Sequence, residues 1–117
     1  MIYSDFMKSL RYGNPWFKLI DQRCFFQAYE KLITYLFEMP EIEIRLAVLS
    51  DDNSVCLGWS ISDRSRLHYV FVKKDFQRQG IGRSLMPRGF ESITHLTKVG
   101  KIIWKKNYKK VIFNPFF

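Results

Sequence analysis

One segment, between positions 69 and 85, constrains the fold of this chain more than any other. An apolar stretch at 69–72 runs into a mostly polar turn at 73–79, and Gly80-Ile81-Gly82 then opens a helical pattern. Glycine lets the backbone approach another group closely, and the first turn of a helix has amides without intrahelical partners. The segment therefore predicts a strand, a turn and a helix whose junction suits an anionic group such as a pyrophosphate.

The other elements follow from changes in the hydrophobic period. Two helices come first, one from Ser4 or Asp5 to Leu10 and one that Asp21 caps and Pro40 ends. The pattern then predicts strands at 44–49, 55–61 and 66–72, a helix at 80–86, a strand at 92–97, a helix at 98–107 and a strand at 111–113. The order ααβββαβαβ, an antiparallel meander followed by strand–helix–strand, indicates an α/β (α+β) fold with a mixed sheet and flanking helices.

Length and composition describe an ordinary globular chain. The 117 residues correspond to one domain over 1–117, and a hydrophobic fraction of 47% excludes a disordered chain. No apolar run reaches the ~18 residues of a membrane helix, and the start lacks a signal-peptide pattern. We therefore expect a cytoplasmic protein without membrane contact. Cys24 and Cys56 are expected in the core, and no metal site is expected.

Charge divides the chain into two unlike halves. Residues 1–63 carry a net charge of −3, whereas residues 64–117 carry +11 and have no acidic residue after Glu91. Such asymmetry favours an anionic ligand or partner for the second half, although a soluble lysine-rich surface would have the same composition.

The glycine segment does not match the commonest phosphate loops. A Walker loop requires Gly-Lys-Ser/Thr, and a dinucleotide fingerprint requires a third glycine where this chain has Leu85. Instead, the run Gln77-Arg78-Gln79-Gly80-Ile81-Gly82 resembles the Gln/Arg-x-x-Gly-x-Gly/Ala acyl-coenzyme A motif of the GNAT superfamily of N-acetyltransferases. The resemblance implies a GNAT-like fold over about 44–113, with splayed central parallel strands.

Further stretches resemble small GNAT-like proteins encoded by tailed bacteriophages. These stretches are Asp5 to Arg11, Leu67 to Lys73, Thr94 to Thr97 and Phe113 to Phe116. This closer resemblance extends over nearly the whole chain. It implies a protein that acts in the cytoplasm of a bacterial host.

The resemblance implies acetyl-coenzyme A as cofactor, bound between the strands at 66–72 and 92–97. The backbone of Phe71 and Val72 would pair with the pantetheine arm, and the Val70 N–H would stabilise the oxyanion. The cofactor-binding residues that it implies are Val70, Phe71, Val72, Gln77, Arg78, Gln79, Gly80, Ile81, Gly82, Arg83 and Ser84. Pro87 shortens the helix that follows, but the first-turn amides remain.

The acid–base groups depart from the family pattern. Arg66 stands where some members have a glutamate base, and an arginine cannot accept a proton at neutral pH. His68, two residues on, is the candidate base or relay, with His95 as a second; the alternative for each is a packed histidine. Trp104 stands at the position of the usual tyrosine acid. Tyr108, one turn later, is the candidate acid or else a structural aromatic.

Three functions remain open. The first is an N-acetyltransferase in which an amine of a protein or small molecule attacks acetyl-coenzyme A directly. The basic surface favours an acceptor in an acidic context, such as an acidic host protein. The second is a non-catalytic GNAT-like protein that modulates a partner by binding. The third is a nucleic-acid-binding module that uses the lysines from Lys98 to Lys110 beside Trp104 and Tyr108. The sequence does not indicate an oligomeric state.

Overall fold

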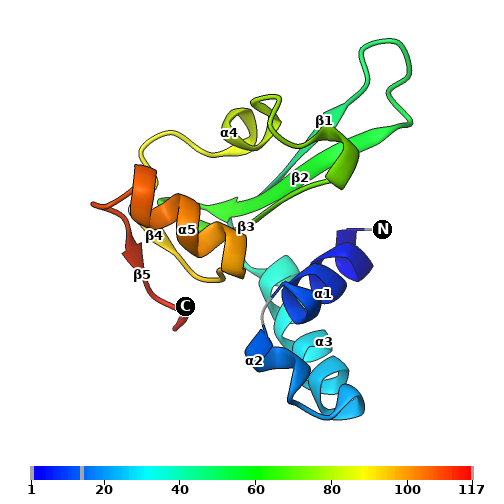
Figure 1. Ribbon diagram of the computed structural model, residues 1–117, viewed down its shortest axis with the longest axis vertical. Coiled ribbons are helices and arrows are strands. Elements are labelled where there is room, and N and C mark those ends of the chain that lie inside the picture. The colour runs from blue at the N-terminus through cyan, green and yellow to red at the C-terminus, as the bar shows by residue number, and fades with distance from the viewer. Residues whose placement is uncertain (1, 14, 117) are drawn as a thin grey trace.

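Three helices open the chain. The computed structural model describes residues 2–13 and 15–116 (Figure 1). Helices α1 (Ile2–Tyr12), α2 (Pro15–Lys18) and α3 (Gln22–Glu38) come first. The carboxylate of Asp21 accepts a hydrogen bond from the Cys24 N–H at 3.2 Å, so the predicted cap of α3 is confirmed. Helix α2 was not predicted. It begins at a proline, which suits the first position of a helix.

A five-stranded mixed sheet follows, in the order β1-β2-β3-β4-β5. The strands are β1 (Ile42–Val48), β2 (Cys56–Asp63), β3 (Arg66–Val72), β4 (Ser92–Ile93) and β5 (Ile112–Phe113). The first three pair antiparallel, whereas β3 with β4 and β4 with β5 pair parallel. The predicted meander, mixed sheet and fold class are therefore confirmed.

The predicted strand at 92–97 is wrong beyond Ile93. The Thr97 hydroxyl accepts a hydrogen bond from the Gly100 N–H at 3.0 Å and caps α5 (Lys98–Asn107). The Lys98 N–H bonds to the Gly13 carbonyl at 2.9 Å, at the end of α1. These contacts draw the segment after β4 away from the sheet toward α1, so it cannot continue the ladder.

Helices cover both faces of the sheet, and each face has its own core. Helices α1 and α3 lie on one side, where Phe6, Ile33 and Trp59 are fully buried together (Figure 1). The short helix α4 (Ile81–Leu85) lies across β1, β2 and β3 on the other side. A smaller cluster there, around Leu67 and Phe90, includes the half-buried Val70, Trp104 and Tyr108. The sheet thus separates two apolar layers.

Two further expectations concern cysteines and membranes. Cys56 is buried as expected, but Cys24 is exposed because it lies on the outer side of the first turn of α3. Both thiols are free. Within residues 2–13 and 15–116, no helix is long and apolar enough to cross a membrane.

Gly58 tests how closely β2 and β3 approach each other. A Cβ atom at this position would lie 2.5 Å from the Phe71 carbonyl oxygen, which is backbone and cannot yield easily. We expect Gly58→Ala to lower the free energy of unfolding by about 1–3 kcal/mol or more, measured by urea denaturation.

Gly82→Ala is the matched control. The nearest atom to a Cβ there is Val72 Cγ2 at 3.7 Å, an ordinary contact distance. Alanine favours a helix over glycine, so this variant should be unchanged or up to about 1 kcal/mol more stable. Equal destabilisation of both variants would contradict the steric argument.

Candidate functional site

Strands β3 and β4 part soon after they meet. Their ladder consists of the pairs Arg66–Ser92 and Leu67–Ile93, and the Thr94 N–H then donates to the Leu67 carbonyl at 3.1 Å. Beyond Leu67, no backbone–backbone hydrogen bond joins β3 to the next segment in the described part of the chain. The second half of β3 therefore borders an opening in the sheet.

A bulge decides which amides face this opening. Ile61 pairs with Tyr69 and Ser62 with Leu67, so His68 is the extra residue on β3. The Lys73 N–H donates to the Leu57 carbonyl at 2.9 Å, and alternation from there directs Phe71 and Tyr69 toward β2. The amides of Val70 and Val72 therefore point into the opening. Backbone pairing with a ligand would come from these two residues, whereas the Phe71 ring packs against Trp59 with the ring centroids 5.7 Å apart.

The glycine segment follows directly at the end of β3. The side-chain amide of Gln77 donates to the Val72 carbonyl at 3.0 Å and ties the turn back to the strand. Two predicted binding residues thus contact each other. Gly80, with φ of 80°, begins α4 in the left-handed conformation that favours glycine. Within the described residues, the amides of 78–83 donate no hydrogen bond to the protein itself.

Gly82 has no structural reason to be glycine. It lies in the helical conformation, and a Cβ would find ordinary space. The side chains of Arg78 and Arg83 nearby are exposed, whereas the Ser84 hydroxyl donates to the Ile81 carbonyl at 2.7 Å. The open amides, the open space and the positive charge together suit an anionic group at this turn. Helix α4 ends at Leu85, one residue before the predicted end, because Pro87 follows.

A chain of polar side chains, with Asp63, His68 and Thr94 buried, crosses the point where the strands part. Arg66 forms two hydrogen bonds with Asp63, at 2.9 and 2.6 Å. Asp63 Oδ1 lies 3.2 Å from His68 Nε2, and His68 Nδ1 lies 2.9 Å from the Thr94 hydroxyl. The same hydroxyl lies 2.9 Å from His95 Nδ1. The chain thus links β2, β3 and the segment after β4.

Burial keeps both histidines of this chain neutral. His68 is 0% exposed, and burial lowers its pKa, although Asp63 partly opposes the effect. A neutral imidazole has one N–H, and the Asp63 carboxylate needs a donor, so His68 donates from Nε2 and accepts from Thr94 at Nδ1. Burial, with a smaller effect of His68, lowers the pKa of His95 to about 4.

The candidate acid–base residues lie on opposite sides of the sheet. The His95 ring packs edge-on against Phe6 of α1, with the ring centroids 5.6 Å apart, and against Tyr29 of α3, with the ring centroids 6.4 Å apart. Tyr108 packs against Phe90 at 5.4 Å, in the cluster that also holds the Val70 side chain. The structure therefore brings His68 together with His95, and Tyr108 together with Val70. The Val70 amide lies in the opening between the two sides.

The side chains at the two usual acid–base positions, Trp104 and Arg66, already bond to other groups of the protein. Trp104 Nε1 donates to the Val111 carbonyl at 2.7 Å, so its indole N–H is not directed at a ligand. Arg66 is held by Asp63. Sequence reasoning missed Asp63 and Thr94, which complete the polar chain. Asp63 lies outside the predicted strands at 55–61 and 66–72, and only its place on the observed sheet beside His68 indicates the pairing.

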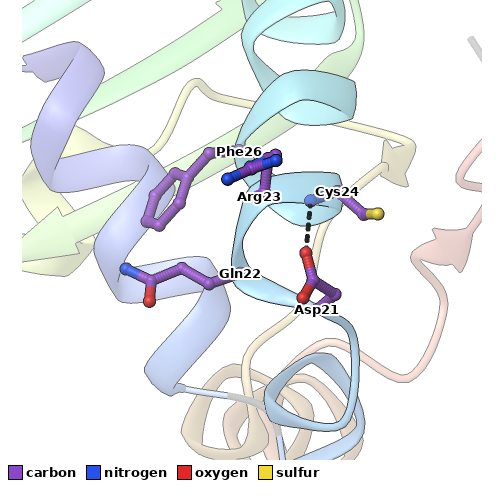
Figure 2. Close-up of a pocket in the computed structure, with 5 residues that line it drawn as sticks. All are labelled: Asp21, Gln22, Arg23, Cys24 and Phe26. Atoms are coloured by element: carbon purple, nitrogen blue, oxygen red, sulfur yellow. Dashed lines mark hydrogen bonds between the residues drawn. The ribbon is translucent and has the colours of Figure 1, made fainter.

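A separate hollow lies at the start of α3 (Figure 2). It is lined by Asp21, Gln22, Arg23, Cys24 and Phe26. The Asp21 carboxylate is used there to cap the helix, as the dashed contact to the Cys24 amide shows. None of the predicted binding residues lines this hollow, and the opening beside β3 remains the candidate site.

The lowered pKa of His95 predicts a pH dependence of stability. Unfolding restores the ordinary pKa of 6.5 from about 4, so the unfolded chain binds more protons between these values. Stability should be full above about pH 6.5 and fall as the pH drops toward 4, by up to about 3 kcal/mol from this residue. Urea denaturation across this range should show a shallower fall for His95→Gln. An equal fall in both proteins would contradict the assignment.

The comparison with known families agrees with this arrangement. A model of the acetyltransferase (GNAT) domain matches residues 23–104, which is more than half of the chain. No curated protein and no solved structure matches this chain. The matched region includes the antiparallel meander, the parting strands, the glycine turn and most of α5. This chain belongs to the GNAT acetyltransferase domain family.

Proposed function

We propose that the protein binds acetyl-coenzyme A in the opening beside β3 and transfers its acetyl group to an amine. The observation that carries the proposal is the position of the Val70 and Val72 amides, which face an opening next to a glycine turn with unbonded amides. Parting strands offer backbone donors to an extended ligand, as a sheet edge does. The adjacent turn offers donors and positive charge to a pyrophosphate.

Each part of the site has a proposed role. Bound acetyl-coenzyme A would supply the thioester that an acceptor amine attacks. The Val70 N–H would donate to the carbonyl oxygen as negative charge develops on it. The amides of 78–82 and the side chains of Arg78 and Arg83 would hold the pyrophosphate. Because the sheet separates His95 from Tyr108, the amine would approach from the side of α1 and α3.

Proton transfer would use the polar chain on that side. A neutral histidine can accept a proton, and His95 is the histidine of the polar chain that is not fully buried. We propose that His95 receives the amine proton and that Thr94 and His68 hold it in orientation. His68 therefore acts as a relay or positioning member because its ring is fully enclosed. Tyr108 would protonate the leaving thiolate from the other side.

The acceptor is proposed to lie in an acidic context. The lysines of α5 are exposed, and Arg78 and Lys74 are exposed near the glycine turn. Such a surface repels a cationic polyamine and attracts an amine set among carboxylates. If the gene belongs to a phage, an acidic protein of the host fits this description.

A second candidate function is binding without turnover. Arg66 and Trp104 stand at the usual positions of the base and the acid, and both are held by other groups. A protein of this kind would bind coenzyme A and modulate a partner by occupancy. Calorimetric binding of acetyl-coenzyme A without release of free thiol, over a panel of amines and acidic proteins, would favour it.

Gly82→Glu tests the cofactor site. The carboxylate would fill the open space and repel a pyrophosphate, so we expect at least about a tenfold loss of acetyl-coenzyme A affinity by calorimetric titration. Gln27→Glu adds one negative charge on the outer face of α3 and is the matched control. The fold of both variants is checked by circular dichroism. Unchanged affinity in a folded Gly82→Glu variant would contradict the site.

Tyr108→Phe tests the proposed acid. Loss of the hydroxyl should lower turnover by roughly tenfold or more, while the affinity for acetyl-coenzyme A stays within about twofold. The ring still packs on Phe90, so the fold should remain. Thiol release and calorimetry measure the two quantities separately. Unchanged turnover would mean that Tyr108 is structural.

A further inference from the structure

Strand β1 is a seven-residue strand at the edge of the sheet, and its outer side lacks the usual features that prevent pairing with another strand. It is the outermost strand of the sheet, and only its inner side pairs, with β2. Exposed edges attract other strands, and proteins blunt them with prolines, lysines or bulges. Residues 42–46 contain no proline, lysine or glycine, and the irregularity of β1 comes later, between Ala47 and Val48.

The register shows which backbone groups face outward. Ser60 and Ser62 of β2 point toward β1, because Trp59 and Ile61 pair with β3 through their backbone. Their partners Arg45 and Glu43 therefore use their backbone groups on β2. By alternation, the N–H and C=O of Ile44 and Leu46 point to the open edge. No hydrogen bond to these groups occurs within residues 2–13 and 15–116.

The side chains of β1 are also unusual for an edge. Ile44 is 42% exposed and Leu46 is 52% exposed, on the face whose inner part α1 and α3 cover. Glu43 and Arg45 lie on the opposite face, and their side chains form an ion pair of 2.6 Å within the strand. The edge thus has an apolar face and a face with one charge of each sign.

This pattern is complementary to itself. Two copies that meet antiparallel about a two-fold axis at Ile44 place Ile44 opposite Ile44, and Ile42 opposite Leu46. In the same register Glu43 lies opposite Arg45 of the other copy, twice. Ile44 then forms a hydrogen-bonded pair, so each charged pair falls at a non-hydrogen-bonded position, where side chains are closest.

Neighbouring registers lack this complementarity. A shift of the axis to position 45 places Arg45 opposite Arg45, and a shift to position 43 places Glu43 opposite Glu43. Like charges directly opposite each other are destabilising. The charges therefore select one register. In it the outward backbone groups of Ile44 pair with those of Ile44 in the other copy, and the Leu46 N–H gains the Ile42 carbonyl as acceptor, while the Ile42 N–H remains bonded to the Met39 carbonyl at 3.4 Å.

We propose that β1 is a homodimer interface, through which two copies pair edge to edge into one continuous sheet. The occupant of the edge is a second copy of this chain, because the strand matches itself in charge, in apolar face and in backbone groups. The interface lies on the far side of β2 from the opening between β3 and β4. The interface therefore does not include the predicted cofactor-binding residues.

Charge variants in a mixing experiment test the proposal. Glu43→Arg alone and Arg45→Glu alone each place like charges opposite each other, so each should dissociate at least roughly tenfold more readily than wild type. Mixed in equal amounts, they restore two opposite-charge pairs between unlike copies and should form a heterodimer. Analytical ultracentrifugation over a range of concentrations measures all three samples, with one variant labelled.

The mixing step separates the interface from effects within one chain. Each variant also loses its internal ion pair, but mixing cannot restore that pair, so recovery on mixing reports contact between copies. Thermal unfolding of each variant checks the fold. The proposal is overturned if wild type sediments as a monomer at every concentration, or if the variants stay dimeric alone. It is also overturned if the folded variants do not associate when mixed.

Discussion

The hydrogen bond between His68 and Thr94 joins two strands at the point where they part. Before His68 along the chain, β3 pairs with β4 as a parallel ladder. After His68, no backbone pairing between these two segments continues among the described residues. The bulge that releases His68 from the ladder also changes which amides of β3 point outward. The direction of the Val70 amide and the place of His68 in the polar chain both depend on this one irregularity. A regular strand here would direct the Val70 amide differently relative to Leu67.

Local signals were sufficient for several elements of the fold. The strand at 66–72, the cap at Asp21 and the helix at 98–107 are local in origin, and the structure has each of them. The segment after Ile93 was predicted as strand because its own residues favour one. Its conformation is decided instead by the end of α1 at Gly13, which is distant in the sequence. Propensity cannot report a contact of this kind.

The candidate site was predictable to a similar degree. The glycine turn is continuous in sequence, so its binding residues lie together whatever the rest of the chain does. The partners of His68 come from other strands. Asp63 lies on β2, across a hairpin, and Thr94 follows β4, across a parallel crossover. The outward direction of the Val70 amide also depends on a bulge that no residue in 66–72 announces. A sequence motif thus identifies the hydrogen-bond donors of the site, whereas their orientation depends on how the strands pair.

The side chain of Gln77 has a consequence for the state of the protein before any ligand binds. An opening in a sheet exposes strand edges inside the molecule, and a foreign strand can extend such an edge into an aggregate. Gln77 donates to the Val72 carbonyl, so the acceptor at the end of this edge is already engaged. A foreign strand needs donors and acceptors in alternation, whereas a ligand with carbonyl groups needs the donors alone. The turn thus keeps the opening receptive to a small acceptor-rich molecule while it discourages pairing with another polypeptide.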